Sequence, residues 1–87
     1  MTELARSPEQ IGNAIRRARK ARGMSQSELG DKSGLRQETI SLIENGNPAT
    51  KLETLLVVLS ALNLELCINE RTKQTMLADA LLSYGEK

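Results

Sequence analysis

Three short helical segments follow one another between residues 8 and 46, and each is ended by a glycine. The run Ser7-Pro8-Glu9-Gln10 is a capping-box pattern, in which a serine and a glutamine satisfy free amides and proline takes the first helical position. Gly23, Gly34 and Gly46 then supply the left-handed residue at which helices commonly end. The run Ser25-Gln26-Ser27-Glu28 is a second capping box, at the start of the next helix. The predicted helices cover about residues 8–22, 25–33 and 36–45.

Apolar residues in these segments recur at three- and four-residue spacing, which predicts one buried stripe on each helix. Aromatic residues make up only 1% of the 87-residue chain, so the core must be built from aliphatic side chains, and such a core favours helices. A chain of this length is expected to form a single domain over residues 1–87. The expected core residues of its first half are Ile11, Ile15, Leu29, Ile40 and Ile43.

A fourth helix is expected after residue 50. The run Thr50-Lys51-Leu52-Glu53 has the pattern of a further capping box, and leucines follow it at helical spacing. We therefore expect this helix to be the best-packed element. Its apolar stripe consists of Leu52, Leu55, Leu56, Leu59 and Leu62.

The apolar period changes from 3.6 to 2 after Asn63. Leu64, Leu66 and Ile68 alternate with polar or small residues, which predicts a short strand over 64–69. A lone strand cannot satisfy its own backbone, and the chain offers no other candidate strand. We therefore expect it to pair with its copy in a second subunit across a two-fold axis.

Residues 75–84 return to helical spacing and predict a short amphipathic C-terminal helix. Two roles are open for it: it either covers the sheet of the dimer or offers its apolar face to a partner.

Charge is unevenly distributed, although the net charge is only +1. Residues 1–36 hold eight Lys and Arg against four Asp and Glu, whereas residues 37–87 hold four against seven. The basic excess lies in one predicted helix, where it either keeps the surface solvated or faces a polyanion such as DNA. It consists of Arg16, Arg17, Arg19, Lys20 and Arg22.

Histidine is absent and Cys67 is the single cysteine. This excludes an intramolecular disulfide, a Cys/His zinc site, and a Ser-His or Cys-His catalytic pair within one chain. We therefore expect no catalytic residues, no metal site and no cofactor, so the protein is not expected to be an enzyme. The N-terminus lacks the pattern of a signal peptide and no stretch is long enough to span a bilayer, which predicts a cytoplasmic protein without a membrane partner.

Residues 23–46 have the sequence form of a helix-turn-helix. Two short helices are joined by a tight turn at Gly34, and Gly30 is small where the helices would touch. In this unit the second helix enters the major groove of DNA, while the first helix and nearby loops hold phosphates.

These residues closely resemble the lambda-repressor-like helix-turn-helix of the Xre/Cro type, over about residues 8–62. The one departure is Gly30, where that family usually has alanine. The matching motifs are Gly23-x-Ser25-Gln26, Leu29, Gly34-Leu35, Ile40-Ser41 and Ile43-Glu44-Asn45-Gly46.

The resemblance implies a mainly α fold, a four- to five-helix DNA-binding domain with one short C-terminal strand that pairs across a homodimer. It implies that Gln26 contacts a phosphate and that Arg19 and Glu44 form a structural salt bridge. It places Gln37, Glu38 and Thr39 at the base-reading end of the third helix. The further phosphate candidates are Arg36, Ser41, Asn45 and Asn47, with Arg16, Lys20 or Arg22 from the first helix.

Each of the base-reading and phosphate candidates has an alternative role as an ordinary exposed side chain. For Arg19 the alternative to the salt bridge is a direct phosphate contact. Chemically, Gln37 can form two hydrogen bonds to adenine and Glu38 can accept one from cytosine N4.

Residues 51–68, a leucine-rich helix followed directly by a strand, resemble the HipB-type antitoxins. This resemblance implies a homodimer that binds an inverted-repeat operator in double-stranded DNA, represses its own operon and binds a HipA-type serine/threonine kinase toxin. A stand-alone dimeric repressor is the alternative. A protein-interaction module without DNA binding is less favoured, because Gln26, Gln37 and the basic first helix are present.

Overall fold

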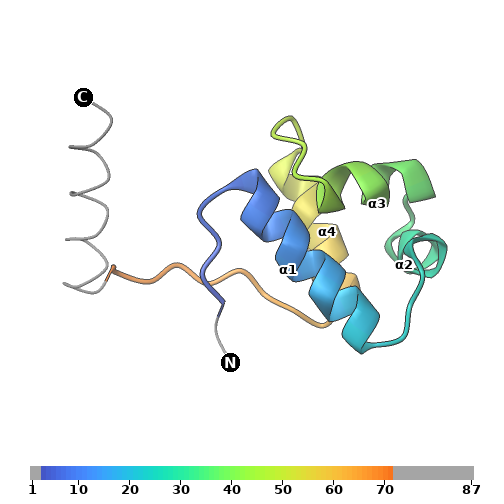
Figure 1. Ribbon diagram of the computed structural model, residues 1–87, viewed down its shortest axis with the longest axis horizontal. Coiled ribbons are helices and arrows are strands. Elements are labelled where there is room, and N and C mark those ends of the chain that lie inside the picture. The colour runs from blue at the N-terminus through green and yellow to red at the C-terminus, as the bar shows by residue number, and fades with distance from the viewer. Residues whose placement is uncertain (1–2, 72–87) are drawn as a thin grey trace.

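Four helices enclose one aliphatic core in the computed structural model, which describes residues 3–71 (Figure 1). Helix α2 packs against α3 and α4, and α1 packs against α3. In Figure 1, α1 crosses in front of α4, and α2 lies near the C-terminal end of α1. The helices are α1 (Pro8–Ala21), α2 (Gln26–Ser33), α3 (Gln37–Glu44) and α4 (Leu52–Ala61).

Helices α1 and α2 begin at the predicted serine caps. Ser25 and Glu28 form the full capping box, with both hydrogen bonds 3.0 Å long. At α1 only half of the box forms: Ser7 Oγ accepts from the amide of Gln10 at 3.1 Å, whereas the Gln10 side chain accepts from the amide of Arg6.

The predicted glycine stops are also present. Gly23, Gly34 and Gly46 have φ angles of 66°, 72° and 83°, in the left-handed region that side chains with a Cβ rarely adopt. Gly34 therefore produces the tight turn that brings α3 back across α2.

The capping box predicted at Thr50 is wrong. Helix α4 begins one residue later, with Lys51 in extended conformation as its N-cap and no side-chain hydrogen bond to the cap. The backbone amide of Thr50 donates instead to the carbonyl of Asn47, 3.3 Å away. Because that amide belongs to the preceding turn, Glu53 cannot complete a box with it.

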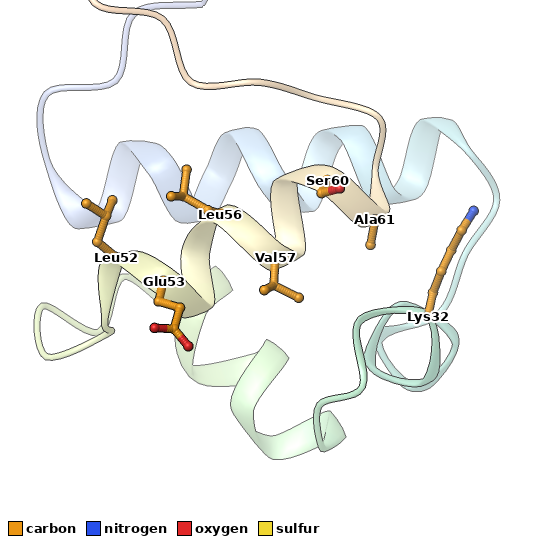
Figure 2. Close-up of a pocket in the computed structure, with 7 residues that line it drawn as sticks. All are labelled: Lys32, Leu52, Glu53, Leu56, Val57, Ser60 and Ala61. Atoms are coloured by element: carbon orange, nitrogen blue, oxygen red, sulfur yellow. The ribbon is translucent and has the colours of Figure 1, made fainter.

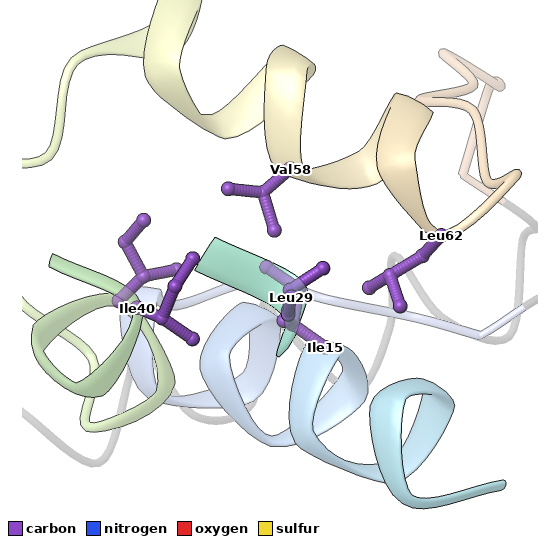
Figure 3. Close-up of a cluster of buried hydrophobic side chains, with 6 residues drawn as sticks. Ile15, Leu29, Ile40, Val58 and Leu62 are labelled. Atoms are coloured by element: carbon purple, nitrogen blue, oxygen red, sulfur yellow. The ribbon is translucent and has the colours of Figure 1, made fainter. Parts of the chain in front are cut away.

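Six aliphatic side chains form the buried core (Figure 3). Of the predicted core residues, all but Ile11 are at most 4% exposed, and Ile11 packs against the edge of the cluster. Because the six come from α1, α2, α3, α4 and the residue that ends α4, the core holds all four helices together. They are Ile15, Leu29, Ile40, Ile43, Val58 and Leu62.

The expectation that α4 is the best-packed helix is wrong. Val58 and Leu62 are buried and Leu55 and Leu59 are partly buried, but three other apolar side chains of α4 are exposed. A helix turns by about 100° per residue, so residues 52 and 56 point away from residues 58 and 62. The predicted leucine stripe is therefore divided between the core and an outer face that carries Leu52, Leu56 and Val57, with exposures of 61%, 43% and 41%.

Two glycines inside helices mark places where backbones approach closely. A Cβ on Gly12 would lie 2.5 Å from the carbonyl oxygen of Ile43, so α1 can rest on the end of α3 only without a side chain there. A Cβ on Gly30 would lie 2.7 Å from the carbonyl oxygen of Leu35. The small size predicted at residue 30 is thus required by the turn itself.

Residues 64–71 lead away from the helices in extended form (Figure 1) and are neither helix nor strand in the described part of the chain. Leu64, Leu66 and Ile68 are 36%, 51% and 94% exposed. The strand over 64–69 was predicted to pair with a second subunit, and this stays a prediction. The C-terminal helix predicted over 75–84 lies outside the described residues.

Candidate nucleic-acid interface

The centre of the candidate site is the buried carboxylate of Glu44, the last residue of α3. Its side chain is inaccessible to solvent. Arg19 of α1 donates to it from Nε at 2.6 Å and from Nη2 at 3.0 Å, and gives a third bond from Nη1 to the carbonyl of Met24 at 2.8 Å. The predicted ion pair between Arg19 and Glu44 is therefore present, in bidentate form, and it ties α1 to α3 and to the start of the helix-turn-helix.

Two further donors reach the same carboxylate. Arg16 Nε lies 3.4 Å from Glu44 Oε1, and Gln26 Nε2 donates to that oxygen at 3.1 Å. Arg16 also donates from Nη2 to Asn45 Oδ1 at 3.1 Å. Glu44 thus joins α1, α2 and α3 at the surface where both helices of the helix-turn-helix meet.

Burial and hydrogen bonding have opposite effects on the pKa of the Glu44 carboxyl. Burial alone raises the pKa of the Glu44 carboxyl, but the hydrogen bonds from Arg19 and Gln26 and the charge of Arg19 outweigh it and hold the pKa below its ordinary value. The hydrogen bond to Glu44 in turn raises the pKa of Arg19. Both groups are therefore charged at neutral pH.

A hydrogen bond also joins Gln26 to Gln37 at the start of α3. A carboxylate only accepts hydrogen bonds, so the bond to Glu44 fixes the amide of Gln26 with its nitrogen inward. Its oxygen then accepts from Gln37 Nε2 at 3.4 Å, which is a long hydrogen bond at an exposed position. The structure thereby brings together the predicted phosphate-binding Gln26 and the predicted base-reading Gln37.

The other predicted base-reading residues stand beside Gln37 in the first turn of α3. Gln37 and Glu38 are exposed, whereas Thr39 is half-buried. No side chain caps α3, because its N-cap is Arg36, which is itself exposed. The N-terminal end of α3 therefore presents Arg36, Gln37 and Glu38 to solvent.

The predicted phosphate candidates differ in their exposure and in the hydrogen bonds that they already form within the protein. Lys20 and Arg22 are exposed, and Arg22 donates from Nη1 to the carbonyl of Ala18 at 2.9 Å. Ser41 is half-buried. Asn47 is half-buried and its Oδ1 accepts from the amide of Ala49 at 3.1 Å, so this side chain shapes the turn before α4.

The roles of Arg16 and Gln26 toward Glu44 are not part of the sequence prediction, which treated both as phosphate candidates. Arg16 and Arg19 are three residues apart and so share a helix face, which is the one signal that could have linked Arg16 to the ion pair. Nothing local in the sequence links Gln26 to Glu44, because the contact depends on how α2 crosses α3.

Residues 3–71 were also compared with the requirements of a membrane-spanning helix and of a metal site. None of the helices within residues 3–71 is long and apolar enough to cross a membrane. In that part of the chain, no three Cys, Asp or Glu side chains gather where they could hold a metal ion.

Comparison with known proteins places this geometry among DNA-binding domains. The family described as helix-turn-helix, HTH_3, matches residues 15–69. The chain is 40% identical over 62 residues to Antitoxin HipB of Escherichia coli O6:H1 (strain CFT073), covering 71% of this chain and 66% of that protein. It is equally similar to Antitoxin HipB of Escherichia coli strain K12, with 40% identity over 62 residues, 71% of this chain and 70% of that protein.

A third relative is an uncharacterized HTH-type transcriptional regulator, y4dL, of Sinorhizobium fredii (strain NBRC 101917 / NGR234), which is 43% identical over 65 residues. The match covers 75% of this chain and 33% of that protein. The chain thus spans about two thirds of the length of the HipB relatives and a third of the length of the regulator.

Two solved structures of HipB complexes also contain chains that are similar to this one. A chain from the structure of a HipA-HipB-O2-O3 complex superposes with a TM-score of 0.76 at 35% identity, covering 82% of this chain and 100% of that chain. A chain from a HipB-O4 20mer complex gives the same TM-score, identity and coverage.

Proposed function

Because the chain belongs to the HTH_3 helix-turn-helix family and is related to the HipB antitoxins, we propose that it is a sequence-specific DNA-binding repressor. We propose further that it is the antitoxin of a toxin–antitoxin operon. The toxin in this proposal is a HipA-type serine/threonine kinase. The antitoxin represses its own operon by occupying an operator, and toxin binding couples the complex to growth control.

One observation carries the DNA-binding part: Gln37 donates a hydrogen bond to Gln26 at the N-terminal ends of α3 and α2, and Gln26 in turn donates to the buried carboxylate of Glu44. Helix N-termini carry partial positive charge and free amides, which favour phosphate. In the proposed complex Gln26 binds a phosphate through its second N–H, while α3 enters the major groove.

The orientation of the two amides predicts what Gln37 reads. One N–H of Gln37 is directed to Gln26, which leaves a second N–H and the carbonyl oxygen for a base edge. Adenine offers an acceptor at N7 and a donor at N6, which match this pair, whereas guanine offers two acceptors. We therefore assign Gln37 to an adenine. Glu38 is assigned to a cytosine N4 amino group in the same groove.

The phosphate contacts in the proposal surround this centre. Arg36, Lys20 and Arg22 are exposed cations that neutralise phosphates, and Asn45 and Ser41 lie on or after the last turns of α3. Thr39 supports the base-reading turn. Arg16 and Asn47 are assigned weaker roles, because each already bonds within the protein.

A two-fold dimer completes the proposal, because an inverted-repeat operator requires two recognition helices related by two-fold symmetry. The extended segment 64–69 pairs with its copy as a short intersubunit strand. Its exposed Leu64, Leu66 and Ile68 support this, since residues 3–71 of one chain leave these side chains uncovered.

The kinase part is tested by affinity purification of the tagged full-length protein from its native cells, with bound proteins identified by mass spectrometry. We expect a stoichiometric protein with a kinase sequence. Recovery of this chain with only its own copies would contradict the antitoxin proposal and support a stand-alone repressor, the role that the similarity to the HTH-type regulator also favours.

The DNA part is tested separately by fluorescence anisotropy, with purified protein and a labelled fragment from upstream of its own gene. We expect tight binding that weakens steeply as salt rises, because phosphate contacts release counterions. Affinity equal to that for an unrelated fragment would contradict the proposed autoregulation.

A further inference from the structure

Leu42 is an exposed leucine on α3, the helix that the proposed function places in the major groove. Its side chain is 54% exposed, and it is the one exposed large apolar side chain on α1, α2 and α3, which the structure describes from end to end. It belongs neither to the aliphatic core nor to the residues packed against that core. The Leu42 side chain is therefore available to contact another molecule.

The helical positions of α3 place Leu42 on the side opposite the core. The buried residues of this helix are Ile40, Ile43 and Glu44. At about 100° per residue, Glu38 and Leu42 project from the opposite side, within about 40° of each other and about 6 Å apart along the helix axis. Leu42 therefore lies beside a residue that the proposed function assigns to a base.

We propose that Leu42 is a specificity-determining residue that contacts the C5-methyl group of a thymine in the operator. The inference rests on the proposed DNA-binding function and deepens it, because it assigns to α3 a base contact that needs no hydrogen bond. The thymine lies within about two base pairs of the cytosine assigned to Glu38, since base pairs follow one another about every 3.4 Å and the two side chains are about 6 Å apart.

The chemistry of the major groove selects thymine for an apolar side chain. Thymine alone among the four bases presents a methyl group there, whereas hydrogen-bond donors and acceptors distinguish the other bases. A leucine placed against those polar atoms removes them from water without replacing their hydrogen bonds, which is unfavourable. Leu42 therefore favours a T·A pair through the methyl contact and disfavours its replacements.

The surroundings of Leu42 fit a single methyl group. On α4 three exposed apolar side chains line one open groove of about 620 Å³ (Figure 2), and contiguous apolar groups of this kind are typical of contacts between proteins. They are Leu52, Leu56 and Val57. On α3, by contrast, the exposed neighbours of Leu42 on the outward side are the polar Glu38 and Asn45. One leucine among polar side chains matches a base edge on which one methyl group lies among donors and acceptors.

Replacement of thymine by uracil tests the contact, because uracil lacks only the methyl group and keeps the base pair. The full-length protein is titrated by fluorescence anisotropy on a duplex from upstream of its own gene, with one thymine replaced at a time. We expect a position at which the dissociation constant rises about fourfold, the factor that the loss of one buried methyl group predicts. This increase should vanish in Leu42→Ala. An increase of the same size in Leu42→Ala, or no sensitive thymine, would overturn the inference.

Gln37→Ala is the matched control, because it removes a different base contact of the same helix. It should lose the preference for adenine and keep the difference between thymine and uracil.

Two further variants separate the apolar character of Leu42 from its size. Leu42→Met keeps an apolar side chain and should keep the difference between thymine and uracil, whereas Leu42→Asn is polar and should lose it. Circular dichroism measures folding, and we expect both variants to fold because Leu42 lies outside the core. A difference that survives in Leu42→Asn would contradict an apolar contact.

These results are separable from the proposed function. A protein that binds its operator no more tightly than unrelated DNA contradicts both proposals. A protein that prefers its operator but does not distinguish thymine from uracil through Leu42 overturns this inference alone. If Leu42 contacts the kinase instead, Leu42→Ala weakens kinase binding and leaves the difference between thymine and uracil unchanged, which overturns the inference and leaves the antitoxin role standing.

Discussion

The Nε atom of Arg19 lies 2.6 Å from Oε2 of Glu44, and the other oxygen of that carboxylate accepts from Gln26 at 3.1 Å. One buried carboxylate therefore holds α1 against α3 and also orients the amide that reaches toward the proposed base-reading residue. Stability and recognition share this group, so its replacement should affect both.

Glu44→Ala should lower the free energy of unfolding by about 3 to 5 kcal/mol, because it leaves the guanidinium of Arg19 buried without its partner. Urea denaturation followed by circular dichroism measures this. The control is Glu38→Ala, which removes an exposed carboxylate from the same helix and should change stability by less than about 0.5 kcal/mol. Similar losses in both variants would mean that the ion pair does not hold the fold.

The pH dependence of stability should follow the lowered pKa of Glu44. The ordinary carboxyl value is 4.5, and a group whose pKa is lower in the folded state stabilises the fold above that value. This contribution is lost as pH falls through the lower, folded-state pKa. Measured by urea denaturation, the stability difference between wild type and Glu44→Gln should be constant near neutral pH and narrow below pH 4.5. A difference that stays unchanged into strong acid would contradict the assignment.

Gly12→Ala should destabilise the protein by about 1 to 3 kcal/mol, although alanine is the better helix former. The added Cβ would lie 2.5 Å from the carbonyl oxygen of Ile43, and α1 must move away from α3 to make room. Thermal unfolding measures the effect. Asn13→Ala, on the exposed side of the same turn, is the matched control and should be neutral or slightly stabilising.

Gln26→Ala should weaken operator binding and also relax the base preference of Gln37, because the relay that orients the Gln37 amide is lost. Arg36→Ala removes an exposed cation and should weaken binding about equally on all sequences, with a salt slope reduced by about 1. Anisotropy titrations on operators altered at one base pair compare the two variants. If Gln26→Ala lowers every affinity by the same factor, Gln26 contacts phosphate only.

The helix boundaries of the first three helices could be predicted from sequence because their signals are local. Ser25 and Glu28 sit three residues apart, and Gly34 needs a left-handed conformation whatever surrounds it. The pair Arg19 and Glu44 is distant in sequence and came from the family resemblance, not from spacing. The two residues of this ion pair could therefore be predicted, but not the bidentate geometry in which they meet.

The predictions failed where tertiary contacts, and not local sequence, determine the cap of a helix or the burial of a side chain. Thr50 has the right residue type for a cap, but its amide is taken by the carbonyl of Asn47. Leu52 and Leu56 fit a helical apolar pattern, but periodicity does not say whether a stripe faces its own core or another molecule. The links from Arg16 and Gln26 to Glu44 depend on how three helices cross, which no local signal records.

Selection of bound sequences from random duplex DNA tests whether α3 reads DNA through Gln37. We expect the full-length protein to enrich an inverted repeat with an adenine in each half-site. We expect Gln37→Ala to lose the preference at that base pair, with a cost of about 1 to 3 kcal/mol on the best sequence. Failure to enrich any motif, or a motif that Gln37→Ala reads unchanged, would contradict this role of Gln37.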